Sequence, residues 1–315
     1  MADVKTAVLF PGQGSQFLGM AQGFIEADPE ARALMKLADQ VSGFPVSALC
    51  QDGPMEELTR TVHLQPALTV VNLICWQAVA KAGIKADYFA GHSLGEYGAL
   101  CAAGVLTPED TLALVTERGR LMEREADKNP GGMRAVVKLD IGTVKEIVAS
   151  AKGAGKITVA NHNSEQQIVV SGEVAALDAA SELVKEKGGK AIPLKVSGAW
   201  HSDLIKDAVP DFEAAMAKVE FKAPLTPILF NVTAAAESEP GAIRNIMAQQ
   251  IASTVRWFEI VEKLMANEVR LFIEVGPKNV LTGLLKKIIP DDYEYRCLQV
   301  DSPAGLADLV KELEA

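Results

Sequence analysis

Apolar residues along this chain form short runs that alternate with longer stretches of helical periodicity. Short apolar runs of four or five residues, bounded by glycine, proline or polar residues, are typical of buried strands. The predicted strands cover residues 6–10, 86–90, 228–231 and 271–275. The predicted helices cover residues 65–81, 94–105, 107–125, 203–219 and 280–289, with another starting at 243. This alternation indicates an α/β fold.

The clearest helix start is at Thr107. Its hydroxyl can cap the helix, Pro108 suits the first helical position, and Glu109 and Asp110 complement the positive end of the helix dipole. We therefore expect a helix from this point to about residue 125.

Between about residues 129 and 197 the pattern of apolar and polar residues changes and predicts six short strands and helices. They are predicted as a strand at 133–139, a helix at 142–152, strands at 157–161 and 167–171, a helix at 174–187 and a strand at 191–196. This βαββαβ order is ferredoxin-like. Because it interrupts the longer alternation, we expect a subdomain at 129–197 inserted into a main domain formed by 1–128 and 198–315.

Composition and charge exclude several classes of protein. With 49% apolar and 23% charged residues, the chain has the composition of a globular protein and not of a disordered one. Its net charge of −10 argues against non-specific binding to nucleic acid or to anionic membranes. The first apolar run, 7–10, is too short for a signal sequence, and polar residues interrupt the longest one, 67–80, so we expect a cytoplasmic protein without a membrane span.

The four cysteines are widely separated and form no CxxC pair. They are Cys50, Cys75, Cys101 and Cys297. This spacing suits neither a zinc site nor a disulfide framework, so we expect isolated reduced thiols and no metal.

The sequence Gly91-His92-Ser93-Leu94-Gly95 matches GxSxG, with a predicted strand before it and a predicted helix after it. In that context the serine stands on a sharp turn as a nucleophile, although a plain packing turn has the same glycines. The glycine-rich run at 11–16 is similar to a dinucleotide-binding fingerprint but does not match it. That fingerprint requires a third glycine at the position of Phe17.

A serine nucleophile needs a base, and the chain has four histidines. His92 is the neighbour of Ser93 and is expected to pack or hydrogen-bond instead. His63 begins an apolar helical run and is expected to be structural, and His162 is expected in a polar surface turn of the subdomain. His201 follows the subdomain where the chain re-enters the main sheet, so it is the favoured base.

Two polar residues are predicted to lie on apolar helix faces. Arg118 shares a face with Leu114, Leu121 and other apolar residues, so its guanidinium needs an anion, either in a structural ion pair or as the carboxylate of a substrate. Gln250 lies on a face with Met247; its amide can be satisfied by protein groups or can orient a catalytic residue.

Four motifs together resemble those of malonyl-CoA:acyl carrier protein transacylases, in the same order and at similar spacing. They are Phe10-Pro11-Gly12-Gln13-Gly14-Ser15-Gln16, the run 91–97 around Ser93, the histidine at the end of 196–201, and Glu274-Val275-Gly276-Pro277 followed by 280–284. The resemblance implies an α/β-hydrolase-like main domain with a ferredoxin-like subdomain. It implies transfer of malonyl from coenzyme A to the phosphopantetheine thiol of acyl carrier protein, for fatty-acid synthesis, without a cofactor or metal.

The resemblance also assigns residues. It implies that Ser93 is the nucleophile, that His201 is its base, oriented by a backbone carbonyl near Gln250, and that Arg118 binds the malonyl carboxylate. The backbone N–H groups of Gln13 and Leu94 would form the oxyanion hole, and Asn163 would lie near the substrate channel.

The chain departs from the family pattern at two places that bear on the acyl pocket. Ala199-Trp200 stands where the family commonly has Pro-Phe or Ala-Phe, which preserves an aromatic wall, and Arg134 follows Met133 where a small residue is usual.

Three alternative functions remain: a serine hydrolase, an acyltransferase that loads a polyketide synthase, and a catalytically silent module that binds carrier protein. An acidic carrier protein requires a local basic patch, for which Lys286 and Lys287 are candidates unless they are simply a solvated helix face. We expect a monomer.

Overall fold

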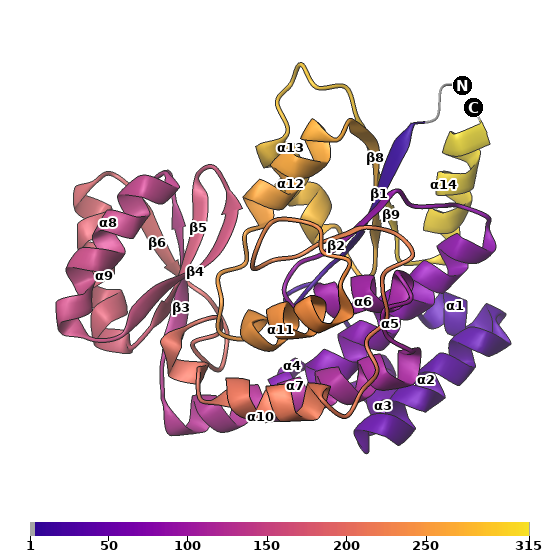
Figure 1. The fold of residues 1–315 in the computed structure, drawn as a ribbon, viewed down its shortest axis with the longest axis horizontal. Coiled ribbons are helices and arrows are strands. Elements are labelled where there is room, and N and C mark those ends of the chain that lie inside the picture. The colour runs from indigo at the N-terminus through magenta and orange to yellow at the C-terminus, as the bar shows by residue number, and fades with distance from the viewer. Residues whose placement is uncertain (1–3, 315) are drawn as a thin grey trace.

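Residues 4–314 are described by the computed structural model, which contains a parallel sheet and an antiparallel sheet (Figure 1). The strands are β1 Lys5–Phe10, β2 Tyr88–Gly91, β3 Gly132–Val137, β4 Ile157–Ser164, β5 Gln167–Gly172, β6 Lys190–Pro193, β7 Ile228–Leu229, β8 Val269–Val275 and β9 Arg296–Val300. The helices before the second sheet are α1 Gln22–Ala27, α2 Pro29–Ser42, α3 Val46–Asp52, α4 Met55–Thr59, α5 Thr61–Lys81, α6 Gly95–Ala102 and α7 Pro108–Lys128. The later helices are α8 Ile141–Ala151, α9 Val174–Glu186, α10 Ala208–Met216, α11 Pro240–Gln250, α12 Trp257–Ala266, α13 Val280–Ile288 and α14 Pro303–Glu314.

The parallel sheet has the order β7-β2-β1-β8-β9, with β1 at its centre. Side chains alternate across a strand, so β1 contributes to two cores. Val8 and Phe10 face the larger core, which contains residues of α2, α5, α6 and α7. Ala7 and Leu9 face a second core formed with α12 and α13. The predicted α/β fold is confirmed, and β1 and β2 both end at the edge of the sheet where the chain turns into the glycine-rich loops.

The antiparallel sheet forms a separate lobe with α8 and α9, at the left of Figure 1. Its order, β4-β5-β3-β6, is that of a ferredoxin-like βαββαβ unit, as predicted. The apolar faces of α8 and α9 pack against one face of this sheet in a core of their own.

Several elements, some of them short, were not predicted from the sequence. They are α1 to α4, α12, β9 and α14. Helices of five to seven residues such as α1, α3 and α4 carry too few turns to show a periodicity, and β9 is only partly buried along most of its length, so it lacks a distinctive apolar pattern. The predicted helix at 65–81 in fact begins four residues earlier, at Thr61.

Helix α5 is the one helix among residues 4–314 that is long and apolar enough to cross a membrane by those two measures. Of its most apolar 18-residue window, 78% is buried inside the protein. It is therefore the central core helix beneath the parallel sheet, and its apolarity is explained by that packing.

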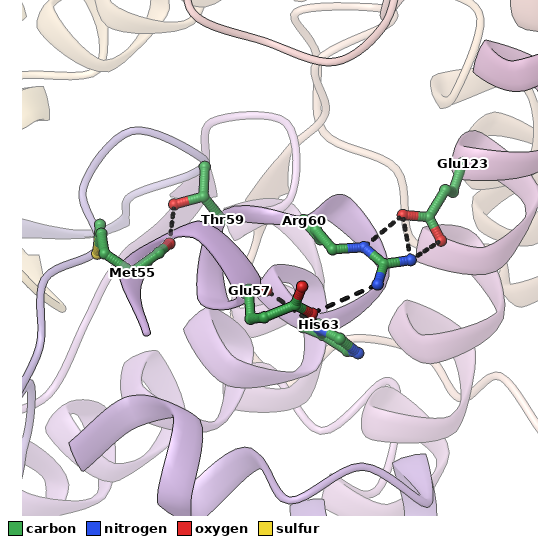
Figure 2. A network of polar contacts seen from close by, with 6 residues as sticks. All are labelled: Met55, Glu57, Thr59, Arg60, His63 and Glu123. Atoms are coloured by element: carbon green, nitrogen blue, oxygen red, sulfur yellow. Dashed lines mark hydrogen bonds and ion pairs between the residues drawn. The ribbon is translucent and has the colours of Figure 1, made fainter. Parts of the chain in front are cut away.

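Polar contacts join the start of α5 to α4 and α7 (Figure 2). Arg60 lies 3.3 Å from carboxylate oxygens of both Glu57 and Glu123, and the latter is on α7. His63 donates from Nδ1 to the backbone carbonyl of Glu57 at 3.0 Å. His63 thus has the structural role that was predicted, and the network helps to seat α7, which carries Arg118, against α5.

Candidate active site

Ser93 lies on the sharp turn between β2 and α6. Its φ angle is +52°, in the left-handed region that a serine rarely adopts. Side chains at Gly91 and Gly95 would collide with the backbone of Gly95 and of Phe10, respectively, so both positions need glycine for this close approach. The local geometry is that of a nucleophile elbow, which exposes the serine hydroxyl at the carboxyl edge of the sheet.

His201 is in hydrogen-bond contact with Ser93. Its Nε2 lies 2.7 Å from Ser93 Oγ, and its Nδ1 lies 3.1 Å from the backbone carbonyl of Gln250. A carbonyl can only accept, so Nδ1 carries the proton and Nε2 is free to accept the serine proton. Burial, assisted by the nearby Arg118 charge, lowers the pKa of His201 to about 3, so the ring is neutral at pH 7.

Arg118 is buried beside the same serine, with a 1% exposed side chain. Its guanidinium donates to Gln65 Oε1 at 2.9 Å and to Gln250 Oε1 at 3.0 Å, and one nitrogen lies 3.4 Å from Ser93 Oγ. The guanidinium also lies over the Tyr97 ring, 5.7 Å from its centre. Among residues 4–314 no carboxylate forms an ion pair with it. Burial lowers the pKa of Arg118, against opposing effects of Tyr97 and Glu96.

Gln250 lies at the end of α11 and is fully buried. Besides the carbonyl contact to His201, its side-chain amide donates to the Ser93 carbonyl at 2.7 Å and to Glu96 Oε2 at 2.8 Å. The amide is thus satisfied by protein groups, and the residue contacts the candidate nucleophile, base and cation; that it orients a catalytic residue stays a prediction.

Asn163, on β4, lies in the wall of the same pocket. Its Oδ1 accepts a hydrogen bond from His92 Nε2 at 2.8 Å. His92 therefore hydrogen-bonds and does not approach Ser93 as a base, as expected. This contact links the antiparallel sheet to the elbow of the parallel sheet.

Gln13 and Leu94 border the pocket from the loops that follow β1 and β2. Within residues 4–314, no hydrogen bond uses the backbone N–H of either residue. The N–H of Ser93 is occupied, because it donates to Asn231 Oδ1 at 2.7 Å. The backbone amides of Gln13 and Leu94 are thus without an acceptor in the described part of the chain.

The pocket lies between the two sheets and has a partly apolar wall. Met133, Val169, Leu194 and Trp200 line it together with Leu281 and Leu284 of α13. Trp200 forms part of the wall, as expected. Arg134 does not, because it points to the other face of β3, where it contacts the Leu177 carbonyl, Ser181 and Asp178 on α9.

The prediction for His162 was wrong. The strand β4 continues to Ser164, three residues beyond its predicted end, so His162 lies within a strand and is buried. Its Nδ1 is 3.2 Å from Glu259 Oε2 on α12. The polar residues 161–164 are typical of a turn, but here they continue the strand and pack against α12.

Three residues that contact the site were not singled out from the sequence. Gln65, Glu96 and Asn231 reach the site from α5, α6 and the end of β7, respectively. Only Glu96 carried a signal, since it belongs to the motif that resembles the transacylases.

Within residues 4–314 no group of three or more His, Cys, Asp or Glu side chains is placed to hold a metal ion. The four cysteines are unpaired thiols. Lys286 and Lys287 are exposed on α13, and Lys287 Nζ lies 2.8 Å from Gln167 Oε1 at the border of the pocket.

Comparison with known proteins places this site in a family. The family model described as "Acyl transferase domain" matches residues 8–297. A malonyl CoA-acyl carrier protein transacylase of Bacillus subtilis is 40% identical over 286 residues, which cover 90% of both chains.

Two solved structures are similar over nearly the whole chain. One is an acyl carrier protein S-malonyltransferase of Vibrio cholerae, with a TM-score of 0.92 and 36% identity, covering 97% of this chain and 99% of that one. The other is a malonyl-transacylase in complex with the acyl carrier protein of a type II polyketide synthase (PKS), with a TM-score of 0.93 and 34% identity, covering 98% and 99%. This chain belongs to the acyl transferase family and, within it, to the malonyl-CoA:acyl carrier protein transacylases.

Proposed function

We propose that this protein transfers malonyl from malonyl-CoA to the phosphopantetheine thiol of acyl carrier protein, for fatty-acid biosynthesis. The proposal rests above all on Arg118, a buried cation with no carboxylate partner in the described part of the chain and 3.4 Å from the Ser93 hydroxyl. A carboxylate on the acyl group supplies the anion that this position lacks.

In the first half-reaction, Ser93 Oγ attacks the thioester carbonyl of malonyl-CoA while its proton passes to His201 Nε2. The carbonyl oxygen takes up negative charge, which the backbone N–H groups of Gln13 and Leu94 stabilise. The carbon–sulfur bond then breaks, and the coenzyme A sulfur leaves with the proton from His201. The product is a malonyl ester on Ser93.

In the second half-reaction the carrier thiol occupies the place that coenzyme A has left. His201 takes the thiol proton, the sulfur attacks the ester carbonyl, and the proton returns to Ser93 as the ester bond breaks. Because both half-reactions use the same groups, no cofactor or metal is needed for either step.

Arg118 selects malonyl over acetyl. Its fork can donate two parallel hydrogen bonds to a carboxylate, whereas an acetyl group leaves the buried cation unpartnered. Gln65 and Gln250 hold the guanidinium through neutral oxygens, so the charge remains available for the substrate.

The acceptor is an acidic protein, and the chain itself has a net charge of −10, so docking requires a local basic surface. Lys286 and Lys287 are exposed on α13, whose residues Leu281 and Leu284 line the pocket. The similar structure with a polyketide carrier favours polyketide loading as the second candidate.

We further propose a monomer that acts in the cytoplasm, divided into a main domain of 1–128 and 198–315 and a subdomain of 129–197. Four unpaired cysteines are in keeping with a reducing compartment.

The test is intact-protein mass spectrometry after brief mixing with malonyl-CoA or acetyl-CoA, followed by addition of carrier protein from a fatty-acid or a polyketide system. We expect one malonyl group on the wild type, none on Ser93→Ala, and rapid transfer to the fatty-acid carrier. Ser150→Ala, which alters an exposed serine on α8, is the matched control and should load like the wild type.

Absence of an adduct on the wild type would contradict the proposal. An adduct that decays in water at the same rate with and without carrier would indicate a hydrolase. Faster transfer to the polyketide carrier would favour the second candidate.

A further inference from the structure

Glu96 carries a buried carboxyl group that the proposed reaction does not use. It is the second residue of α6, has 0% exposure, and forms no ion pair among residues 4–314. Both of its oxygens accept hydrogen bonds: Oε1 from the backbone N–H of Asn231 at 2.6 Å and Oε2 from Gln250 Nε2 at 2.8 Å. Burial raises the pKa of Glu96 to about 8, against these two donors and the Arg118 charge, so Glu96 is mostly a neutral carboxyl group at pH 7.

The contact to Gln250 decides which end of that amide faces Arg118. An amide has one accepting oxygen and one donating NH2 group. Because Glu96 Oε2 and the Ser93 carbonyl accept, the NH2 group must point to them. The oxygen is then left for Arg118, which donates to it at 3.0 Å. Reversal of the amide would set an NH2 group against a guanidinium.

The other oxygen of Glu96 acts on the elbow. Asn231, whose N–H it accepts, receives the Ser93 N–H on Oδ1 and donates from Nδ2 to the Gly91 carbonyl, both at 2.7 Å. The carboxyl group of Glu96 therefore contacts both Asn231, which binds the strained backbone of Ser93, and the Gln250 amide, which contacts Arg118.

We propose that Glu96 is a positioning residue that sets the preference for malonyl over acetyl by fixing the orientation of the Gln250 amide toward Arg118. This inference rests on the proposed function. Glu96 is separated from Arg118 by Gln250, so the carboxyl group orients the guanidinium without occupying it.

The test compares Glu96→Gln with the wild type in the rates of Ser93 acylation from malonyl-CoA and acetyl-CoA, with KM and kcat for each. In Glu96→Gln one of the two accepting oxygens becomes an NH2 group, which opposes either the Gln250 NH2 group or the Asn231 N–H. Rotation of Gln250 to relieve the first of these contacts removes the acceptor from Arg118. We expect kcat/KM for malonyl-CoA to fall about 10- to 100-fold and that for acetyl-CoA to fall much less. A merely structural role would lower both equally.

A second pair of variants tests whether Glu96 acts through Gln250. Gln250→Met removes the amide but keeps the backbone carbonyl that contacts His201, and it should itself lower the malonyl preference. In the Gln250→Met background, Glu96→Gln should change the preference no further. If Glu96→Gln fails to fold, Gln250→Met alone decides: an unchanged preference overturns the inference.

The matched control is Glu125→Gln on α7, a carboxylate with 0% exposure whose contacts are Arg124 and Lys128. It should keep the wild-type preference. Two results would overturn this inference and leave the proposed function intact. One is that Glu125→Gln loses as much of the malonyl preference as Glu96→Gln does. The other is that Glu96→Gln keeps the wild-type preference while the wild type forms a malonyl adduct. A wild type that forms no malonyl adduct overturns the proposed function as well.

Discussion

Two contacts determine the protonation of His201. The Gln250 carbonyl holds the proton on Nδ1, and burial beside Arg118 keeps the ring neutral. A histidine with its ordinary pKa would be largely protonated at pH 5 and could not accept the proton of Ser93. The depressed pKa therefore has a direct consequence for the pH dependence of the first half-reaction.

We predict that acylation of Ser93 by malonyl-CoA is nearly independent of pH between 5 and 7, where Glu96, with a pKa of about 8, also keeps one protonation state. The neutral ring is the active form and is lost only as the pH falls toward the pKa of about 3. A base of ordinary pKa would lose about 25-fold over the same interval. Rapid-quench measurement of the malonyl adduct across this interval checks the prediction, and a half-maximal rate near pH 6.5 would contradict it.

A second prediction concerns the shape of the Arg118 side chain as opposed to its charge. Arg118→Lys keeps a cation but loses the planar fork that contacts both Gln65 and Gln250. We expect malonyl loading to fall about 10- to 100-fold, with a smaller effect on acetyl loading. Arg118→Met, which removes the charge, should lose more of the preference.

Competition between equimolar malonyl-CoA and acetyl-CoA, read as the ratio of the two adduct masses, measures this preference directly. Retention of the wild-type ratio in Arg118→Met would show that another group binds the malonyl carboxylate.

Individual site residues could be predicted from the sequence where the neighbouring residues form a recognisable pattern. Ser93 stands in a motif, and Arg118 stands on an apolar helix face. Gln65 and Asn231 could not be found, because their partners are 53 and 138 residues away in the chain and nothing near them indicates a contact. His162 was misplaced because its polar neighbours, Asn161 and Asn163, are characteristic of a turn when burial is unknown.

At the scale of elements, α7 shows how local signals and packing combine. Thr107 caps its start by accepting from the Asp110 N–H at 3.1 Å, as the sequence predicted. Its other end and its inward face are set by contacts with α5 and α10. Thr107 caps helix α7, and Arg118 lies within it. Because these residues lie about three turns apart, the stability of the first turn can be tested separately from the chemistry of the site.

We predict that Thr107→Ala lowers the free energy of unfolding by about 1 kcal/mol, since the first turn loses its side-chain acceptor. Thr107→Ser should keep the cap and stay within a few tenths of a kcal/mol of the wild type. Urea denaturation measures both. Malonyl loading should be unchanged in either variant, because Thr107 is exposed and lies three turns from Arg118. Equal stability of the alanine variant and the wild type would contradict the capping role.

Length and periodicity do not by themselves separate the predicted elements from the missed ones: the 14-residue helix α2 was missed, whereas α5, which is buried along most of its length, was predicted. All six elements of the ferredoxin-like unit were found within a few residues; five of them bury apolar residues in one core, to which β6 contributes only the partly buried Ala191. Helices α1, α3 and α4 were missed because they have only five to seven residues, whereas the length of α2, 14 residues, does not explain why it was missed. The order of strands in the parallel sheet also could not be read from the sequence, because β8 pairs with β1 across more than 250 residues.

At the scale of the whole molecule, the two sheets are joined along the edge of β4. Residues before α12 run parallel to this strand, with a bridge between Asn161 and Val255. The Val255 N–H donates to the Ala160 carbonyl at 2.8 Å, and the His162 N–H donates to the Val255 carbonyl at 2.9 Å. The edge of the antiparallel sheet is thus paired by the main part of the chain, which also gives the pocket its second wall.

We predict that both sheets unfold in one transition, because separation of the lobes would expose this paired edge and the pocket lining together. Far-UV circular dichroism reports on both sheets, whereas the three tryptophans, Trp76, Trp200 and Trp257, all lie outside residues 132–193 and report on the main part. Their midpoints in urea should coincide.

Val255→Pro removes the N–H that pairs with β4 and should separate the two midpoints, with the circular dichroism change beginning first. An exposed change elsewhere, such as Lys145→Ala on α8, should leave them coincident. Separate midpoints in the wild type would mean that the antiparallel lobe is held only loosely. The contact between His92 and Asn163, which crosses from elbow to β4, would then form and break with that lobe, and malonyl loading would be lost at the first midpoint.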